Sequence, residues 1–284
     1  MTAEPAFEPA APLPGPLPQA VRYLVTLGVV ALWMTLGWLL HLGPNGYLLL
    51  GVPLLVFFQL GIARRPISEL WIRPAEPEKF PWWGYAVAAV FMVMPGWDLT
   101  HHWVRAGWVG RLWLGCAIVG ALPLAFTITR FSWKTLKSLL LCLATAGVLG
   151  VGYMVITAYF RDRLGDLSGE QVLSGGRQFL LYLPVGFVLE EVFFRGGLDS
   201  YLHRPGDRFP WLSAAFVSVL WGLWHLPISP AHTVLQLLVL SIIFPFIHCL
   251  VGIPFSFFWR SSGSLLVPAA VHAFIDSVRN VLLH

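Results

Sequence analysis

The sequence predicts an all-α protein, a polytopic membrane bundle of eight or nine transmembrane helices. Of its 284 residues, 57% are hydrophobic and 11% are charged, whereas soluble domains carry roughly 25% charged residues. The apolar residues fall in successive stretches long enough to cross a hydrocarbon core of about 30 Å at 1.5 Å per residue. Many of the 14 tryptophans lie near the ends of these stretches, as in the aromatic belts at membrane interfaces.

A proline-rich tail precedes the first predicted helix. Residues 1–19 contain no basic segment ahead of an apolar run, so we expect a disordered tail rather than a signal peptide. Residues 20–284 form one transmembrane domain. Its first half contains predicted spans at 22–42, 46–63, 81–96, 112–129 and 138–160. The third span is short and bounded by Pro81 and Pro95, so losing it would leave eight helices.

Further spans at 179–198, 211–227, 233–257 and 263–283 complete the bundle. They carry carboxylates, histidines and an arginine at membrane depth, whereas the earlier spans carry almost none. An ionised side chain at the bilayer centre costs at least about 2.5–3.5 kcal/mol on insertion scales. A functional site is therefore expected in the core at 179–284.

The basic residues predict the orientation of the bundle. The net charge is +4, but Lys and Arg are scattered through short loops, which indicates membrane orientation rather than nucleic-acid binding. If nine spans cross, most basic residues lie on the side of the N-terminus, which is then cytoplasmic. That side would carry Arg22, Arg64, Arg65, Arg73, Lys79, Arg130, Lys134, Lys137, Arg204, Arg208 and Arg260, and the other side Arg105, Arg111, Arg161, Arg163, Arg177 and Arg279.

The first ionisable motif is EEVFFR, at residues 190–195. Glu191 and Arg195 are spaced i, i+4, so they are expected to form an ion pair on one helix face. Glu190 points elsewhere and has no local counter-charge. Because burial disfavours its charged form, such a carboxylate is suited to accept a proton as a general base. The alternative is a packing or transport role, which the additional glutamate makes less favourable.

Two further motifs place histidines at membrane depth. Trp221 lies one helical turn before His225 and can wall its pocket. His272 and Asp276 are spaced i, i+4 in the last span, so they can face one cavity. A base, two imidazoles and a further carboxyl are the parts needed to activate water and stabilise an oxyanion. The motifs together predict hydrolysis of an amide bond.

Other residues rank lower as functional candidates. His248 and Trp224 are expected to pack between helices, and His101 and His102 to lie in an interfacial loop. Asp199 is a lesser candidate. The cysteines lie inside apolar stretches and are expected to be small core residues rather than disulfides or zinc ligands, namely Cys116, Cys142 and Cys249.

The order EExxxR, aromatic-xxx-H and HxxxD resembles the CAAX protease and bacteriocin-processing family of intramembrane endopeptidases, also called the Abi family. The resemblance covers roughly residues 179–280. It implies a glutamic-type protease in which Glu190 and His225 activate the attacking water, while His272 and Asp276 stabilise the oxyanion. It also implies a structural role for Glu191 and Arg195.

Two positions depart from the family pattern. The second motif begins with Trp221 where phenylalanine is usual, a mild change. The third ends in Asp276 where asparagine is frequent, and a carboxylate cannot donate a hydrogen bond unless it is protonated. Either Asp276 is kept neutral by burial, or it orients His272 and the imidazole alone meets the oxyanion.

No cofactor is expected, and zinc is the alternative. Glu190, His225 and His272 could form a His2Glu zinc shell, with Asp276 as an additional group. The metal-free mechanism is favoured because the resemblance implies it and no HExxH helix is present.

The expected partners are membrane lipids and a peptide or membrane-protein substrate, including lipidated or C-terminally anchored ones, and no nucleic acid. Short loops and the proline-rich tail favour a multi-pass protein of a bacterial inner membrane. The competing functions are a proteolytically inactive scaffold and an ion-coupled transporter. A transporter predicts inverted repeats and polar residues in both halves, which the sequence lacks.

Overall fold

The computed structural model describes residues 17–73, 80–101, 107–163, 168–204 and 206–283. Helices account for all regular structure in these segments, and the sole β-type pairing there is an isolated bridge between Ile72 and Ser264. The first half contains α1 (Gln19–Leu40), α2 (Pro44–Phe57), η1 (Phe58–Ile62), η2 (Ile67–Leu70), α3 (Trp82–His101), α4 (Gly107–Ile128), α5 (Trp133–Cys142), η3 (Leu143–Gly147) and α6 (Val148–Phe160). The second half contains α7 (Gly169–Val185), η5 (Val192–Asp199), α8 (Ser200–Leu202), α9 (Pro210–Trp224), η6 (Leu226–Ile228), α10 (Val234–Ser262) and α11 (Leu266–Leu283).

Seven helices in the described segments are long and apolar enough to cross a membrane. They confirm a polytopic helical bundle but not the predicted count of eight or nine. The candidate spans are Gln19–Leu40, Pro44–Ile62, Gly107–Ile128, Trp133–Phe160, Pro210–Ile228, Val234–Ser262 and Leu266–Leu283. Neither α3 nor the segment formed by α7 and η5 is among them.

Two predicted boundaries are wrong. The span expected at 81–96, with Pro95 near its end, continues as α3 to His101, so this proline lies inside the helix. The span expected at 179–198 is interrupted, because α7 ends at Val185 and helical structure resumes at Glu190. Pro184 and Gly186 flank that end. A proline lacks a backbone N–H and clashes with the carbonyl of the preceding turn, and glycine destabilises a helix interior relative to alanine.

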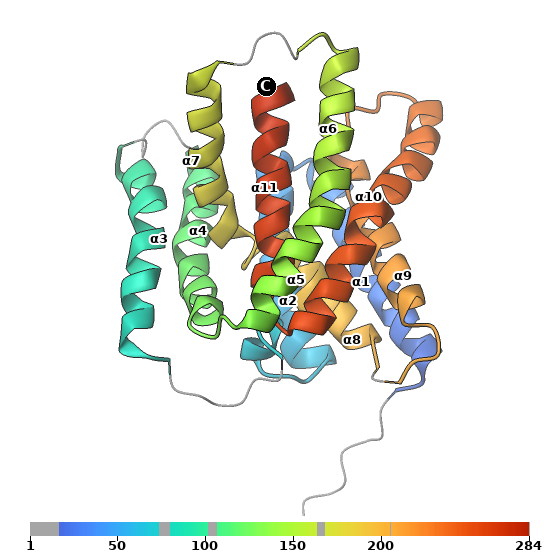
Figure 1. Ribbon diagram of the computed structural model, residues 1–284. Helices are drawn as coiled ribbons and strands as arrows, with labels where there is room; N and C mark the ends of the chain where they lie inside the picture. Colours follow the sequence, from blue (N-terminus) through green and yellow to red (C-terminus); the bar gives the residue numbers. More distant parts are fainter. Residues whose placement is uncertain (1–16, 74–79, 102–106, 164–167, 205, 284) are drawn as a thin grey trace, which may run out of the picture.

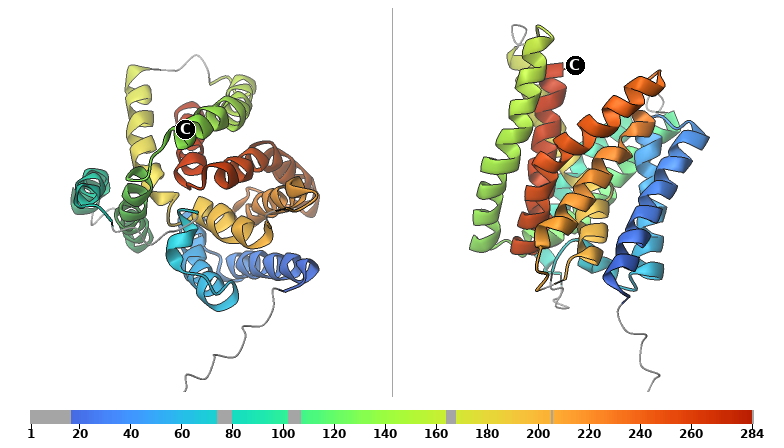
Figure 2. Two further views of the ribbon diagram at one scale, coloured as in Figure 1. Left: turned by 60° about the horizontal axis from the view of Figure 1, so that its bottom comes forward. Right: turned by 90° about the vertical axis from the view of Figure 1, so that its right-hand side faces the viewer.

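The long helices run between two ends of the bundle, with the start of α1 at one end, called here the N-terminal end, and the end of α11 at the other (Figure 1). Their contacts are not uniform, since α10 packs along α9 and α11 packs against α6 and α7. Viewed from the side, α10 is inclined to α6 and α11 (Figure 2). The inclined α10 thereby brings its middle turns towards the helices that carry the polar motifs.

An aromatic cluster fills the centre of the bundle beside these motifs. The Trp224 ring lies 4.9 Å from both Trp33 and Tyr47 and is fully buried. The Tyr47 hydroxyl donates a hydrogen bond of 2.8 Å to the backbone carbonyl of Trp224. Phe194 packs edge-on against Trp224 at 5.7 Å. The cluster fixes the end of α9, where His225 follows.

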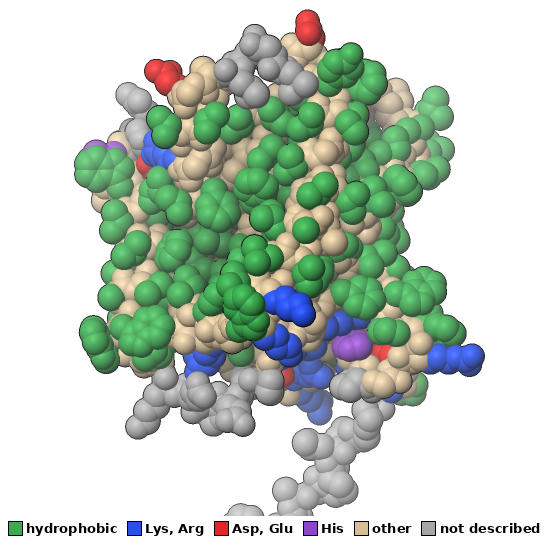
Figure 3. Space-filling model, in the orientation of Figure 1, with side chains coloured by type: hydrophobic (Ala, Val, Ile, Leu, Met, Phe, Trp, Pro, Cys, Tyr) green, Lys and Arg blue, Asp and Glu red, His purple; other side chains and the backbone are tan. Residues whose placement is uncertain are grey.

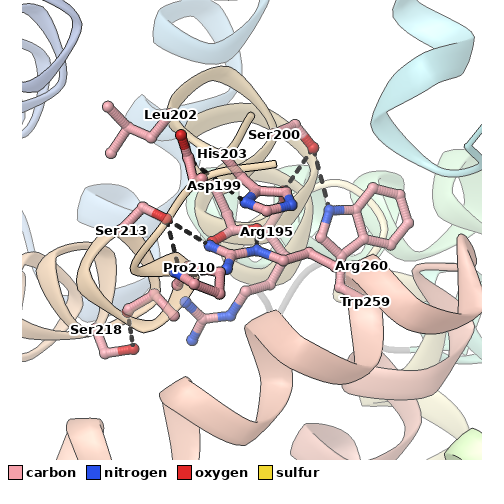
Figure 4. Close-up of polar contacts among 12 residues, drawn as sticks. Arg195, Asp199, Ser200, Leu202, His203, Pro210, Ser213, Ser218, Trp259 and Arg260 are labelled. Carbon is pink, nitrogen blue, oxygen red and sulfur yellow. Dashed lines mark hydrogen bonds and ion pairs between the residues drawn. The ribbon is translucent and has the colours of Figure 1, made fainter. Parts of the chain in front are cut away.

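Hydrophobic side chains cover the visible flank of the bundle, and Lys and Arg gather at its lower end, which is the N-terminal end (Figure 3). A polar network closes this end. Arg260 of α10 pairs with Asp199 at 2.9 Å through Nε and also donates to the Pro210 carbonyl and the Ser213 hydroxyl (Figure 4). Asp199 is fully buried. This ion pair holds the end of η5 against α9 and α10, so Asp199 serves the fold.

Candidate active site

The break between α7 and η5 determines the directions in which Glu190 and Glu191 of the first motif point. Residues 186–189 form turns, and Glu190 and Glu191 begin the next helical segment. Glu191 is fully buried and faces the interior, whereas Glu190 is partly exposed and lines a cavity. Adjacent helix positions point about 100° apart, so the two carboxylates face different surroundings.

Glu191 joins two cationic or protonatable groups. Its Oε2 lies 3.4 Å from Nε of Arg195, in the ion pair expected from the i, i+4 spacing. Its Oε1 lies 3.0 Å from Nδ1 of His272 on α11. The buried Arg195 guanidinium also lies over the Trp221 ring, 4.9 Å from its centroid. Glu191 therefore links α11, which carries His272, to η5, which carries Arg195, through charge-assisted contacts.

Trp221 contacts both the Glu190 carboxylate and the imidazole of His225. Its indole N–H donates to Oε2 of Glu190 at 3.0 Å. His225 caps the end of α9, and its Nδ1 lies 2.9 Å from the Trp221 carbonyl oxygen. A carbonyl only accepts hydrogen bonds, so Nδ1 carries the proton and Nε2 keeps its lone pair. The ring of His225 is thus prepared to accept a proton at Nε2.

The third motif presents a carboxylate that is already paired. Oδ2 of Asp276 lies 3.6 Å from Nε2 of His272, and Oδ1 lies 2.9 Å from Nη1 of Arg279. The side chain of Asp276 is 16% exposed. Asp276 therefore contacts both His272 and Arg279, and this is the geometry required by the second alternative drawn from the sequence, in which Asp276 orients His272.

Two cavities meet at these residues. The first, of about 210 Å³, lies between α2, α4, α7 and α11, and the second, of about 190 Å³, lies between α6, α9, α10 and α11. Both are lined by the same five ionisable side chains, from three different parts of the chain: Glu190, His225, His272, Asp276 and Arg279. Every residue expected to be catalytic from the sequence therefore lies in the wall between two cavities.

His248 was expected to pack between helices, but it lines the second cavity. Its ring lies 4.4 Å from that of His225 and 4.5 Å from that of Trp221. Nδ1 donates to the Phe244 carbonyl at 2.7 Å. Arg279 is a charged cavity residue that the sequence analysis did not assign to the site. The sequence signal was present, since Arg279 lies one helical turn beyond Asp276.

The described residues include no group of three or more His, Cys, Asp or Glu side chains placed to hold a metal ion. Of the proposed zinc set, His272 has both ring nitrogens near carboxylates, Glu191 and Asp276.

Among known proteins, residues 176–278 match the family model described as type II CAAX prenyl endopeptidase Rce1-like. No curated protein and no solved structure matches the chain. The matched segment includes all three motifs and confirms the resemblance seen in the sequence. It supports intramembrane peptidase activity. Residues 176–278 of this multi-pass membrane protein therefore form a domain similar to the Rce1-like type II CAAX prenyl endopeptidases.

Proposed function

We propose that the protein is an intramembrane endopeptidase of the glutamic type, in which Glu190 and His225 activate a water molecule. The observation that carries the proposal is the meeting of Glu190, His225 and His272 in the wall shared by two cavities. The proposed substrates are peptides or membrane proteins, including lipidated and C-terminally anchored ones, because the matching family is named for a prenylated C-terminal motif.

The chemistry follows from the atoms that face the cavities. A water between the Glu190 carboxylate and Nε2 of His225 attacks the scissile carbonyl carbon, and its proton passes to Glu190. The new C–O bond leaves an oxyanion on the former carbonyl oxygen. When the intermediate collapses, the C–N bond breaks and Glu190 returns the proton to the leaving amine. Trp221 holds Glu190 in place through its indole N–H.

A comparison of wild type with Glu190→Gln tests the proposal. The purified proteins in detergent are incubated with a mixed library of transmembrane and lipidated peptides, with and without a chelator. Loss of a general base costs typically about 10²- to 10⁴-fold in rate, so we expect cleavage by the variant to fall at least about 100-fold, and wild-type cleavage to survive the chelator.

The matched control is Glu170→Gln, at the exposed start of α7, which should cleave like wild type. Wild-type rates in Glu190→Gln, or no cleavage by wild type, would contradict the proposal. Loss of wild-type cleavage on chelation would replace it with a zinc mechanism.

A further inference from the structure

One cationic side chain, that of Arg279, lines the two cavities at the candidate active site. Among the described residues that line either cavity, Arg279 is the sole Lys or Arg, and it lines both. Its side chain is 39% exposed, so it is not enclosed by the protein. The family match ends at residue 278, so nothing in that match assigns a role to Arg279.

Two of the cavity side chains, Asp276 and Trp221, are not placed to supply the donor that the chemistry needs. Attack of water on an amide creates an oxyanion, which needs hydrogen-bond donors placed in advance. Asp276 is paired with Arg279, and an ionised carboxylate only accepts hydrogen bonds. The Trp221 indole N–H is directed to Glu190. These side chains therefore leave the oxyanion without a donor from Asp276 or Trp221.

Arg279 is held in a defined position on two sides. Its Nη1 lies 2.9 Å from Oδ1 of Asp276. Its Nε donates to Oδ1 of Asn280 at 3.2 Å, and the Asn280 amide donates to the Tyr182 hydroxyl at 3.1 Å. Tyr182 belongs to α7 and lines the first cavity. These contacts use Nη1 and Nε, and they leave the N–H groups of Nη2 as donors.

We propose that Arg279 is a catalytic residue that donates a hydrogen bond from its guanidinium to the oxyanion, while Asp276 is a positioning residue that orients Arg279 and His272. The assignment rests on the proposed peptidase function and adds a residue to it. It also explains how the chain tolerates a carboxylate at position 276 beside a developing negative charge, because the guanidinium neutralises that carboxylate.

The test compares cleavage by wild type with three variants. They are Arg279→Ala, Arg279→Ala with Asp276→Asn, and Arg279→Ala with Asp276→Leu. Removing one oxyanion donor costs about 10²- to 10³-fold in kcat, so Arg279→Ala should lose at least about 100-fold. The introduced asparagine amide supplies a new donor, so the first double variant should regain at least about tenfold. The introduced leucine removes the unpaired carboxylate without supplying a donor, so the second double variant should regain nothing.

The matched control is Arg177→Gln, since Arg177 forms an ion pair with Asp98 between α7 and α3 and lines neither cavity. It should leave cleavage unchanged. Size-exclusion profiles and thermal unfolding in detergent establish that each variant is folded. Equal recovery in both double variants would overturn the assignment, because charge neutralisation would then be the whole role of Arg279.

Undiminished cleavage by folded Arg279→Ala would also overturn it, while a simultaneous loss in Glu190→Gln would leave the proposed function standing. Absence of cleavage by wild type would remove the proposed function and this assignment with it.

Discussion

At the scale of single residues, the neighbouring glutamates 190 and 191 have different surroundings. Replacing Glu191 should lower the stability of the folded protein, whereas replacing Glu190 should not. Glu191 is fully buried and contacts both Arg195 and His272. Removing one partner of a buried pair typically costs about 3–5 kcal/mol because the other charge is left uncompensated. We therefore expect Glu191→Ala to lower the yield and the thermal stability of folded protein.

Fluorescence-detected size exclusion after heating measures the yield and thermal stability of Glu191→Ala against wild type. Glu170→Ala, at the exposed start of α7, is the control. Glu190→Gln should elute as wild type does. A normal melting profile for Glu191→Ala, or equal losses for both glutamates, would end the division of roles between them.

The motif residues could be predicted from the sequence because charges at membrane depth are rare and i, i+4 spacing sets which side chains share a face. His272 and Asp276 were expected to face one cavity, and they do. The position of His248 beside the second cavity could not be predicted, because it depends on how α10 is rotated and inclined against α9. Spacing along one helix carries no information about a neighbouring helix, and a single histidine in an apolar span is most often a packing residue.

At the scale of helices, the apolar runs predicted a polytopic helical bundle but neither the number of its spans nor their interruptions. Pro184 and Gly186 lie where α7 ends, whereas Pro95 with Gly96, and Pro123, lie inside continuous helices. Tertiary contacts decide between these outcomes, since the carbonyl freed by a proline must find another partner.

The polar network at the N-terminal end of the bundle should be a second determinant of stability. Arg260 bridges Asp199 of η5 to the start of α9, and both side chains are nearly inaccessible to solvent. Asp199→Ala leaves the arginine without its carboxylate, so we expect a loss of about 3–5 kcal/mol.

Thermal unfolding of purified protein measures the effect of Asp199→Ala. Asp207→Ala is the control, since Asp207 is only partly buried and caps a backbone N–H of Arg204. A wild-type melting temperature for Asp199→Ala would show that the network contributes little.

At the scale of the whole molecule, the distribution of charge and the position of the cavities predict the face from which substrate enters. Lys and Arg gather at the N-terminal end (Figure 3), and the positive-inside rule places that end in the cytoplasm. The first cavity is lined by Pro44 and Asn45, which begin α2 after the 22-residue α1, and by Arg279 near the C-terminus. The site should therefore open towards the non-cytoplasmic side.

Labelling of single introduced cysteines in intact cells tests this orientation. His232 is exposed between η6 and α10, and Arg208 is exposed between α8 and α9 at the opposite end of the bundle. The native cysteines all lie within helices, so they are replaced by serine or alanine in the background.

A membrane-impermeant thiol reagent should label His232→Cys and not Arg208→Cys, and permeabilised cells should label both. The reverse pattern would place the N-terminus outside and turn the site towards the cytoplasm. Because the cavities are fixed relative to α1, this one labelling result decides which compartment the substrate must come from.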